Sequence, residues 1–172
     1  MNFVVLASGP SMTQALADSV RGRAKVVAVS DAYRLAPWAD ALASTDAKWW
    51  KSHPAAQDFE GLKFTAAPDF VPVAGVERLP VDTHTNSGLL GLMVAVKLGA
   101  KRVLMCGFDL QGTHFFGPHP EPLRNTKPER FEQFKKQFAA YRPRGIEIVN
   151  CTPNSGLQAY RMGDLMEQLG KS

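Results

Sequence analysis

The chain has 172 residues, of which 45% are hydrophobic and 21% are charged. This composition is that of an ordinary soluble globular protein, and the length suits one domain spanning residues 1–172. No apolar run is long enough to cross a bilayer, which excludes a membrane-spanning segment. The N-terminal apolar stretch has no basic leader and is interrupted by Pro10, so we interpret it as a strand and not a signal peptide. We therefore expect a cytoplasmic protein.

Charge and cysteine content narrow the function classes further. Lys and Arg number 20 against 16 Asp and Glu, a net charge of +4, and part of the excess lies within residues 124–144. A solvated helix face is the favoured interpretation; a surface for an anionic substrate is the alternative, so nucleic acid is not excluded.

Two cysteines, Cys106 and Cys151, are too few for a disulfide framework or a four-cysteine zinc site, and we expect buried thiols. The sequence also allows a homo-oligomer.

The first half of the chain alternates apolar strand-like runs with turn residues. The first run ends at the loop Ser8-Gly9-Pro10-Ser11, and Ser11 is predicted to cap the helix that follows. Three prolines and little periodicity indicate mostly irregular structure at residues 67–82, with a strand near its end. In chain order we expect strands at 2–7, 25–30, 41–44, 62–66 and 76–79, and a helix at 12–21.

The second half continues the alternation. An apolar helix at 87–99 is predicted to start at a cap formed by Asn86 or Ser87 and to end at Gly99. Further on we expect a strand at 102–106, a loop at 111–128, a helix at 129–142 with an apolar stripe of Phe131, Phe134 and Phe138, a strand at 145–150 and a helix near 164–169. The whole pattern predicts a single-domain, Rossmann-like α/β fold, with a mostly parallel sheet covered by helices on both faces.

Short polar side chains follow several of the predicted strands. Because ligands of open parallel sheets bind outside the carboxyl ends of the strands, we expect these residues to line one polar crevice. They are Ser8, Ser11, Ser30, Asp31, Thr45, Asp46, Asp109, Asn154 and Ser155.

The loop Ser8-Gly9-Pro10-Ser11 is the strongest single element. A strand, a glycine and a helix start place free backbone N–H groups and the positive helix end together, which favours phosphate. Gly9 would allow close backbone approach and Pro10 would fix the entry to the helix. The alternative is a plain tight turn, because neither a GxGxxG nor a Walker A pattern is present. Asn86-Ser87-Gly88 repeats the arrangement at a second helix start.

Histidines supply the candidate proton-transfer groups. His114 and His119 flank Phe-Phe-Gly-Pro in the loop after a strand, where either could act as base, acid or metal ligand. A metal site built from Asp109 with these histidines matches no ligand signature, so we predict none. His53 and His84 are weaker candidates. Trp49-Trp50 is interpreted as a core anchor, with a stacking surface for a base or sugar as the alternative.

Four blocks in this order resemble the bacterial sialyltransferases of glycosyltransferase family 42: ASGPSM, NSGLLGLMVAVKLGAKRVLMCGFDL, HFFGPH and TPNSGL. The related archaeal pterin pyrophosphokinases share part of the pattern. The resemblance implies a cytidine-nucleotide donor site and a histidine general base, His114 or His119. It implies donor contacts at Gly9, Pro10, Ser11, Ser87, Gly88, Asn154 and Ser155.

The chain also departs from that family. Ser8 stands where the family has asparagine, and Ser30-Asp31 and Thr45-Asp46 stand where it has asparagines after the second and third strands. A carboxylate there would repel a diphosphate or a sialic acid carboxylate unless a cation intervened, although Asp31 could contact a ribose hydroxyl. Only residues 110–113 separate the strand from the histidine loop, where the family carries a lid. This compact form is similar to bacteriophage proteins.

Three functions are therefore compatible with the residues. The first is a glycosyltransferase-like enzyme that uses a nucleotide-activated sugar, a histidine base and no cofactor. The second is a pyrophosphokinase or other phosphoryl-transfer enzyme in which Asp31, Asp46 or Asp109 holds Mg²⁺. The third is a non-catalytic module that binds a nucleotide. All three predict a nucleotide or nucleotide-sugar as the small-molecule partner.

Overall fold

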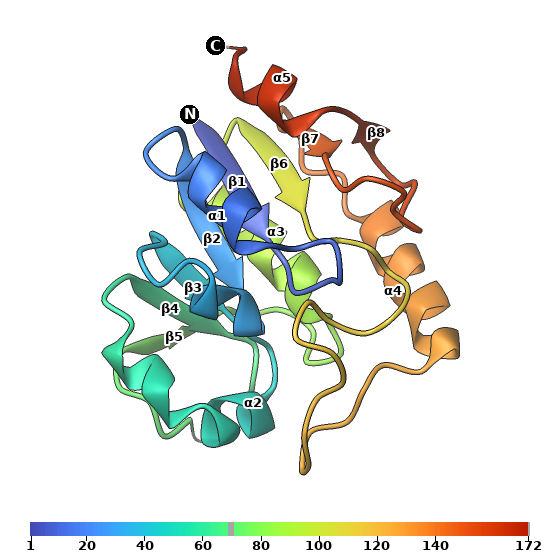
Figure 1. The fold of residues 1–172 in the computed structure, drawn as a ribbon. Coiled ribbons are helices and arrows are strands. Elements are labelled where there is room, and N and C mark those ends of the chain that lie inside the picture. Colours follow the sequence, from blue (N-terminus) through green and yellow to red (C-terminus); the bar gives the residue numbers. More distant parts are fainter. Residues whose placement is uncertain (69–70, 172) are drawn as a thin grey trace.

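A computed structural model describes residues 1–68 and 71–171. Within these residues, eight parallel strands form one sheet in the order β5-β4-β3-β2-β1-β6-β7-β8, which confirms the predicted α/β, Rossmann-like fold (Figure 1). The strands are β1 (Asn2–Leu6), β2 (Lys25–Val29), β3 (Ala41–Ala43), β4 (Leu62–Thr65), β5 (Val76–Arg78), β6 (Arg102–Cys106), β7 (Glu147–Asn150) and β8 (Arg161–Met162).

Helices cover both faces of the sheet. They are α1 (Gln14–Val20), α2 (Ala47–Ser52), α3 (Ser87–Lys97), α4 (Pro128–Ala140) and α5 (Leu165–Leu169), with 3-10 turns η1 (Ser30–Arg34) and η2 (Pro54–Asp58). Successive strand side chains point to opposite faces, so Val5 packs in one core cluster and Val4 and Leu6 in the other. The first cluster takes in α3 and the end of α4; the second takes in α1, α2 and α5. In Figure 1, α1 lies in front of the sheet and α3 behind it.

The order of the strands creates a crevice between β1 and β6. From β1 the chain adds strands outward to β5, then crosses back and adds β6, β7 and β8 on the other side. Leu6 pairs with Cys106, so the loops that follow these two strands start from adjacent positions at the carboxyl edge of the sheet, and the Gly9 N–H donates to the Gly107 carbonyl at 2.9 Å. A reversal of this kind is where open α/β sheets bind their ligands.

The start of α1 differs from the prediction. The helix begins at Gln14, and the Thr13 hydroxyl, not Ser11, caps it by accepting from the N–H of Leu16 at 3.1 Å. Pro10 therefore does not form the helix entry either. The physical reason is Met12, which is 3% exposed in the core beside Gly107 and keeps the preceding segment in a turn.

Four short elements were not predicted: the two 3-10 turns η1 and η2, the helix α2 and the strand β8. Six residues, AKWWKS, form α2, which is too short for a helical period to be legible, and two residues form β8. Trp49 and Trp50 of α2 are 4% and 0% exposed, which confirms the core interpretation.

Cys106 and Cys151 are buried free thiols, as expected, and burial raises the pKa of Cys151 to about 11. Across the described part of the chain, every helix is too short or too polar to span a bilayer.

Candidate functional site

A cavity of about 730 Å³ opens at the carboxyl ends of the strands, beside the β1–β6 reversal. Its walls come from the loops after β1, β2, β3 and β6, from the first residues of α3, and from α4. Of the residues singled out in the sequence, the cavity is lined by Ser8, Gly9, Ser30, Asp31, Thr45, Asp46, Asn86, Ser87, Gly88, Asp109, His114 and His119. The lining does not include Pro10, Ser11, Asn154 or Ser155.

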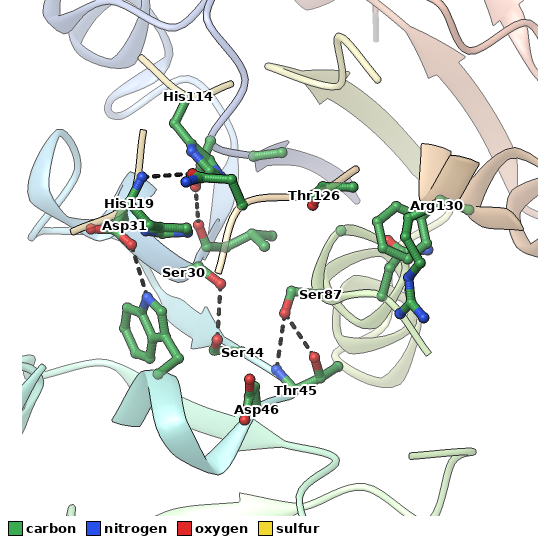
Figure 2. A pocket seen from close by; sticks show the side chains of 18 of the residues that line it. Ser30, Asp31, Ser44, Thr45, Asp46, Ser87, His114, His119, Thr126 and Arg130 are labelled. Atoms are coloured by element: carbon green, nitrogen blue, oxygen red, sulfur yellow. Dashed lines mark hydrogen bonds between the residues drawn. The ribbon is translucent and has the colours of Figure 1, made fainter. Parts of the chain in front are cut away.

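Paired hydroxyl groups form part of the wall. Ser30 and Ser44 hydrogen-bond to each other at 2.8 Å, and the Ser87 hydroxyl bonds the Thr45 hydroxyl at 2.9 Å and accepts its N–H at 3.0 Å (Figure 2). These bonds join the ends of β2 and β3 to α3. Ser44 was missed by the sequence interpretation, because it reads as the last residue of an apolar strand. Hydroxyls both donate and accept, so this wall suits the polar edge of a sugar or a phosphate.

The first loop is arranged differently from the prediction. The Asp109 carboxylate accepts the Ser11 hydroxyl at 2.8 Å and the Ser11 N–H at 3.4 Å. A side chain at Gly9 would collide with that carboxylate and with the Gly107 carbonyl. The close approach that Gly9 permits in this structure is thus that of Gly107 and Asp109, in the loop after β6. Because α1 starts further on, the loop does not present a helix N-terminus to the cavity.

Asp31 is buried, with 2% exposure, and is surrounded by donors. It accepts from the Trp49 indole at 2.8 Å, from Arg34 at 2.9 Å and from Nε2 of His53 at 3.1 Å. Burial alone would raise its pKa, but the hydrogen bonds from His53, Trp49 and Arg34 hold the pKa of Asp31 well below its usual range. Its negative charge is therefore compensated locally, which reduces the repulsion that the sequence led us to expect toward an anionic ligand.

His53 completes this cluster. Its Nδ1 lies 2.7 Å from the Trp49 carbonyl while Nε2 faces Asp31, so both ring nitrogens face acceptors. Burial favours the neutral ring, but the hydrogen bonds to Asp31 and to the Trp49 carbonyl outweigh it and raise the pKa of His53. The cation form can donate to both partners. His53 is therefore a structural partner of Asp31 and is not in the cavity lining.

His114 and His119 lie together on residues 107–127, the segment between β6 and α4. Their ring centroids are 4.1 Å apart, and His114 stacks on Phe116 at 4.8 Å. Burial lowers the pKa of both imidazoles, and for His119 the neighbouring His114 lowers it further. Both rings are therefore neutral at pH 7.

One hydrogen bond sets the tautomer of His114. Its Nδ1 lies 3.2 Å from the Gly117 carbonyl. A carbonyl oxygen only accepts, so Nδ1 carries the proton and Nε2 carries the lone pair. Nδ1 of His119 is buried and has no hydrogen-bond partner within the described residues. Of the two rings, His114 is thus the one whose tautomer the protein determines.

Arg34 attaches this segment to the rest of the fold. Its guanidinium lies over Phe116 at 5.1 Å and over Phe115 at 5.7 Å, while it also bonds Asp31. The Phe115 N–H donates to the Ser8 carbonyl at 3.1 Å. Phe116 consequently has Arg34 and His114 as ring neighbours. Asp31 therefore holds Arg34, Arg34 contacts Phe116, and Phe116 in turn positions the ring of His114.

Basic side chains line the cavity as well: Lys48, Arg124, Lys127 and Arg130. Three of these belong to the local charge excess seen in the sequence, for which a solvated helix face was the favoured interpretation. In Figure 2, Arg130 lies on the opposite side of the pocket from His114 and His119. The cavity lining therefore contains four cationic side chains and a neutral histidine pair, with Arg130 across the pocket from the histidines (Figure 2).

The candidate magnesium ligands each have another partner. Asp46 caps α2 by accepting the N–H of Lys48 at 2.9 Å, and Asp109 and Asp31 are engaged as described above. Residues 1–68 and 71–171 contain no group of three or more His, Cys, Asp or Glu side chains arranged to hold a metal ion.

The turn at Asn154 and Ser155, implied by the resemblance to contact a donor, makes several hydrogen bonds within the fold. The Ser155 hydroxyl bonds the Phe108 carbonyl at 2.5 Å and accepts from the Asn150 amide at 3.0 Å. Asn154 takes a left-handed φ of 54°, and its carbonyl accepts from Gln111. These contacts hold the end of β7 against residues 107–111, which line the cavity, while Asn154 and Ser155 themselves lie outside the lining.

Among solved structures, the chain is similar to the MAf glycosyltransferase from Magnetospirillum magneticum AMB-1, with a TM-score of 0.64 and 15% sequence identity. The match covers 94% of this chain and 33% of that one, so the chain spans about a third of the neighbour's length. At this identity the likeness shows a shared fold. No protein-family model and no curated protein matches the chain, so the sialyltransferase and bacteriophage resemblances stay expectations.

Proposed function

We propose that the chain is a glycosyltransferase that uses a nucleotide-activated sugar donor. The observation that carries this proposal is a histidine pair, one member with its tautomer determined, in a cavity whose lining also contains four cationic side chains, one of which, Arg130, lies across the pocket from the histidines (Figure 2). The fold it shares with a protein described as a glycosyltransferase is consistent with the proposal.

The proposed roles follow from the chemistry of the lining. The donor's phosphates lie among Lys48, Lys127 and Arg130, and its sugar lies against the hydroxyl wall. Nε2 of His114 takes the proton of an acceptor hydroxyl, whose oxygen forms the new bond to the anomeric carbon. The bond from that carbon to the phosphate oxygen breaks, and its electron pair leaves with the nucleotide, whose added charge the cations stabilise.

We further propose that this transfer needs no metal ion, because the three cations can offset the developing phosphate charge. Within the glycosyltransferase class, a cytidine-nucleotide donor of the sialyltransferase type is the first to try. The compensated charge of Asp31 makes an acidic sugar admissible there.

A turnover assay across nucleotide sugars tests the proposal. We expect His114→Asn to abolish transfer while donor binding, measured by calorimetry, is retained, because the imidazole acts on the acceptor. A double variant, His114→Asn with His119→Asn, should behave in the same way. Full turnover by that double variant would contradict the proposed mechanism.

A further inference from the structure

The phenylalanine stripe of α4 changes its environment along the helix. Phe138 is 1% exposed and belongs to the core cluster of α3, and half-buried Phe134 packs against that cluster. Phe131, also half-buried, belongs to neither core cluster in the described residues, yet it lines the cavity. All three rings of the predicted apolar stripe line the cavity, and Phe131 is the one that packs into neither core cluster of the described residues.

Cationic side chains near Phe131 in the sequence line the same cavity. Arg130, the preceding residue, also lines the cavity, and its guanidinium lies over the Phe134 ring at 5.5 Å. Lys127 lies at the N-cap of the same helix, and Arg124 lies just before it; both line the cavity too. Flat aromatic surface and positive charge thus occur side by side. A nucleotide combines the complementary groups, a flat heterocycle and an anionic phosphate.

The other aromatic rings of the cavity lining are engaged within the protein: Arg130 lies over Phe134, and Phe108 packs edge to face against Phe138. Trp49 and Trp50 are buried, and Trp49 stacks on His53 with a ring-centroid distance of 4.2 Å. Phe116 has Arg34 and His114 as ring neighbours. Arg130, which adjoins Phe131, lies across the pocket from the histidines that face the reacting end of the donor in the proposed mechanism (Figure 2). A base at Phe131 and a sugar near His114 would place the phosphates between them.

We propose that Phe131 is the stacking platform for the nucleobase of the donor, with Arg130 beside it. This rests on the proposed function and adds the base subsite to it. The subsite selects an aromatic heterocycle over a saturated sugar ring, and it tolerates several bases because stacking uses the π-face that all bases share.

Calorimetric binding to purified protein tests the platform. The probes are CMP, UMP, AMP and GMP, with ribose 5-phosphate and glucose 1-phosphate as ligands that lack a base. Phe131→Ala should weaken the binding of the best nucleotide by about 5- to 100-fold, the range that base–aromatic stacking contributes. Binding of the two sugar phosphates should not change. Phe131→Leu should lose affinity as Phe131→Ala does, and Phe131→Tyr should retain it.

Gln133→Ala is the matched control, because Gln133 is exposed on the same helix and lies outside the cavity lining. Thermal unfolding of each variant verifies that α4 is intact. Nucleotide binding unchanged in Phe131→Ala would overturn the platform and leave the proposed function standing. Equal losses for nucleotides and sugar phosphates would also overturn it, since the ring would then not serve the base. If none of the nucleotides binds the unaltered protein, the proposed function fails as well.

Discussion

At the scale of single residues, the candidate base depends on one backbone carbonyl. The Gly117 carbonyl fixes the proton of His114 on Nδ1, which leaves Nε2 able to accept a proton. Burial adds to this by disfavouring the charged ring. Neither effect can be derived from residue types, because both depend on how residues 113–117 fold back on themselves.

The pH dependence of turnover follows from this environment. The pKa of His114 lies below its ordinary value of 6.5, so the base form persists as the pH falls through that value. We expect kcat/KM to be level near neutrality and to decline only below pH 6.5, because the acid limb reports protonation of the free enzyme's base. A pH profile measures this. An acid limb centred above 6.5 would contradict a buried base.

The charge of Asp31, like the protonation state of His114, depends on neighbours that only the folded structure brings together. From the sequence its carboxylate was an obstacle to an anionic donor, because nothing indicated which cations would lie near it. The structure places Arg34, the Trp49 indole and His53 around it. His53 comes from the end of α2, an element too short to predict, which is why this compensation was not foreseen.

At the scale of elements, one asparagine connects two helices. The Asn86 side chain caps α3 by accepting the Leu89 N–H at 2.9 Å, as the sequence indicated. Its amide also donates to Gln137 of α4 at 2.8 Å. The cap could be predicted from local sequence, whereas the partner 51 residues away could not.

We predict that Asn86→Ala lowers the free energy of unfolding by about 1 kcal/mol or more, the usual cost of losing an N-cap. Chemical denaturation monitored by circular dichroism measures this. Asn86→Asp is the matched control, because it keeps the capping oxygen and loses only the amide donor to Gln137. If the two variants were equally destabilised, the cap would not be the main contribution.

At the scale of the whole molecule, the cavity exists because the strand order reverses between β1 and β6. That reversal brings together loops from both halves of the chain, and α4 adds Lys127 and Arg130 from a third segment. The net charge of +4 over the whole chain does not indicate that these cations gather in one cavity.

Ionic strength should therefore control ligand affinity. We expect the affinity for CDP or UDP to fall severalfold between 0.1 M and 1 M salt, as the Debye length shortens from about 10 Å to about 3 Å. A variant with Lys127→Gln and Arg130→Gln should bind more weakly and show a smaller salt dependence. Lys136→Gln removes a charge from the same helix outside the cavity lining and should leave both unchanged. Equal salt dependence in all three proteins would contradict a role for these cations.

A chelator separates the transferase proposal from the phosphoryl-transfer alternative. If the cations of the lining suffice, nucleotides should raise the melting temperature equally with EDTA and with Mg²⁺, because a ligand that binds the native state stabilises it. A melting-temperature shift that appears only with Mg²⁺ would favour the alternative instead.

Local sequence determined the longer strands and helices and the fold class, because apolar strands, caps and turn residues act over a few residues, whereas α2, β8 and the start of α1 were not predicted. It also determined that polar side chains gather at the strand ends, since parallel strands share one carboxyl edge. Tertiary structure alone decided the use of each side chain. Ser11 bonds Asp109 instead of capping α1, Ser155 supports β7, and Phe131 faces the cavity. These outcomes depend on contacts between residues far apart in the chain, which local periodicity does not encode.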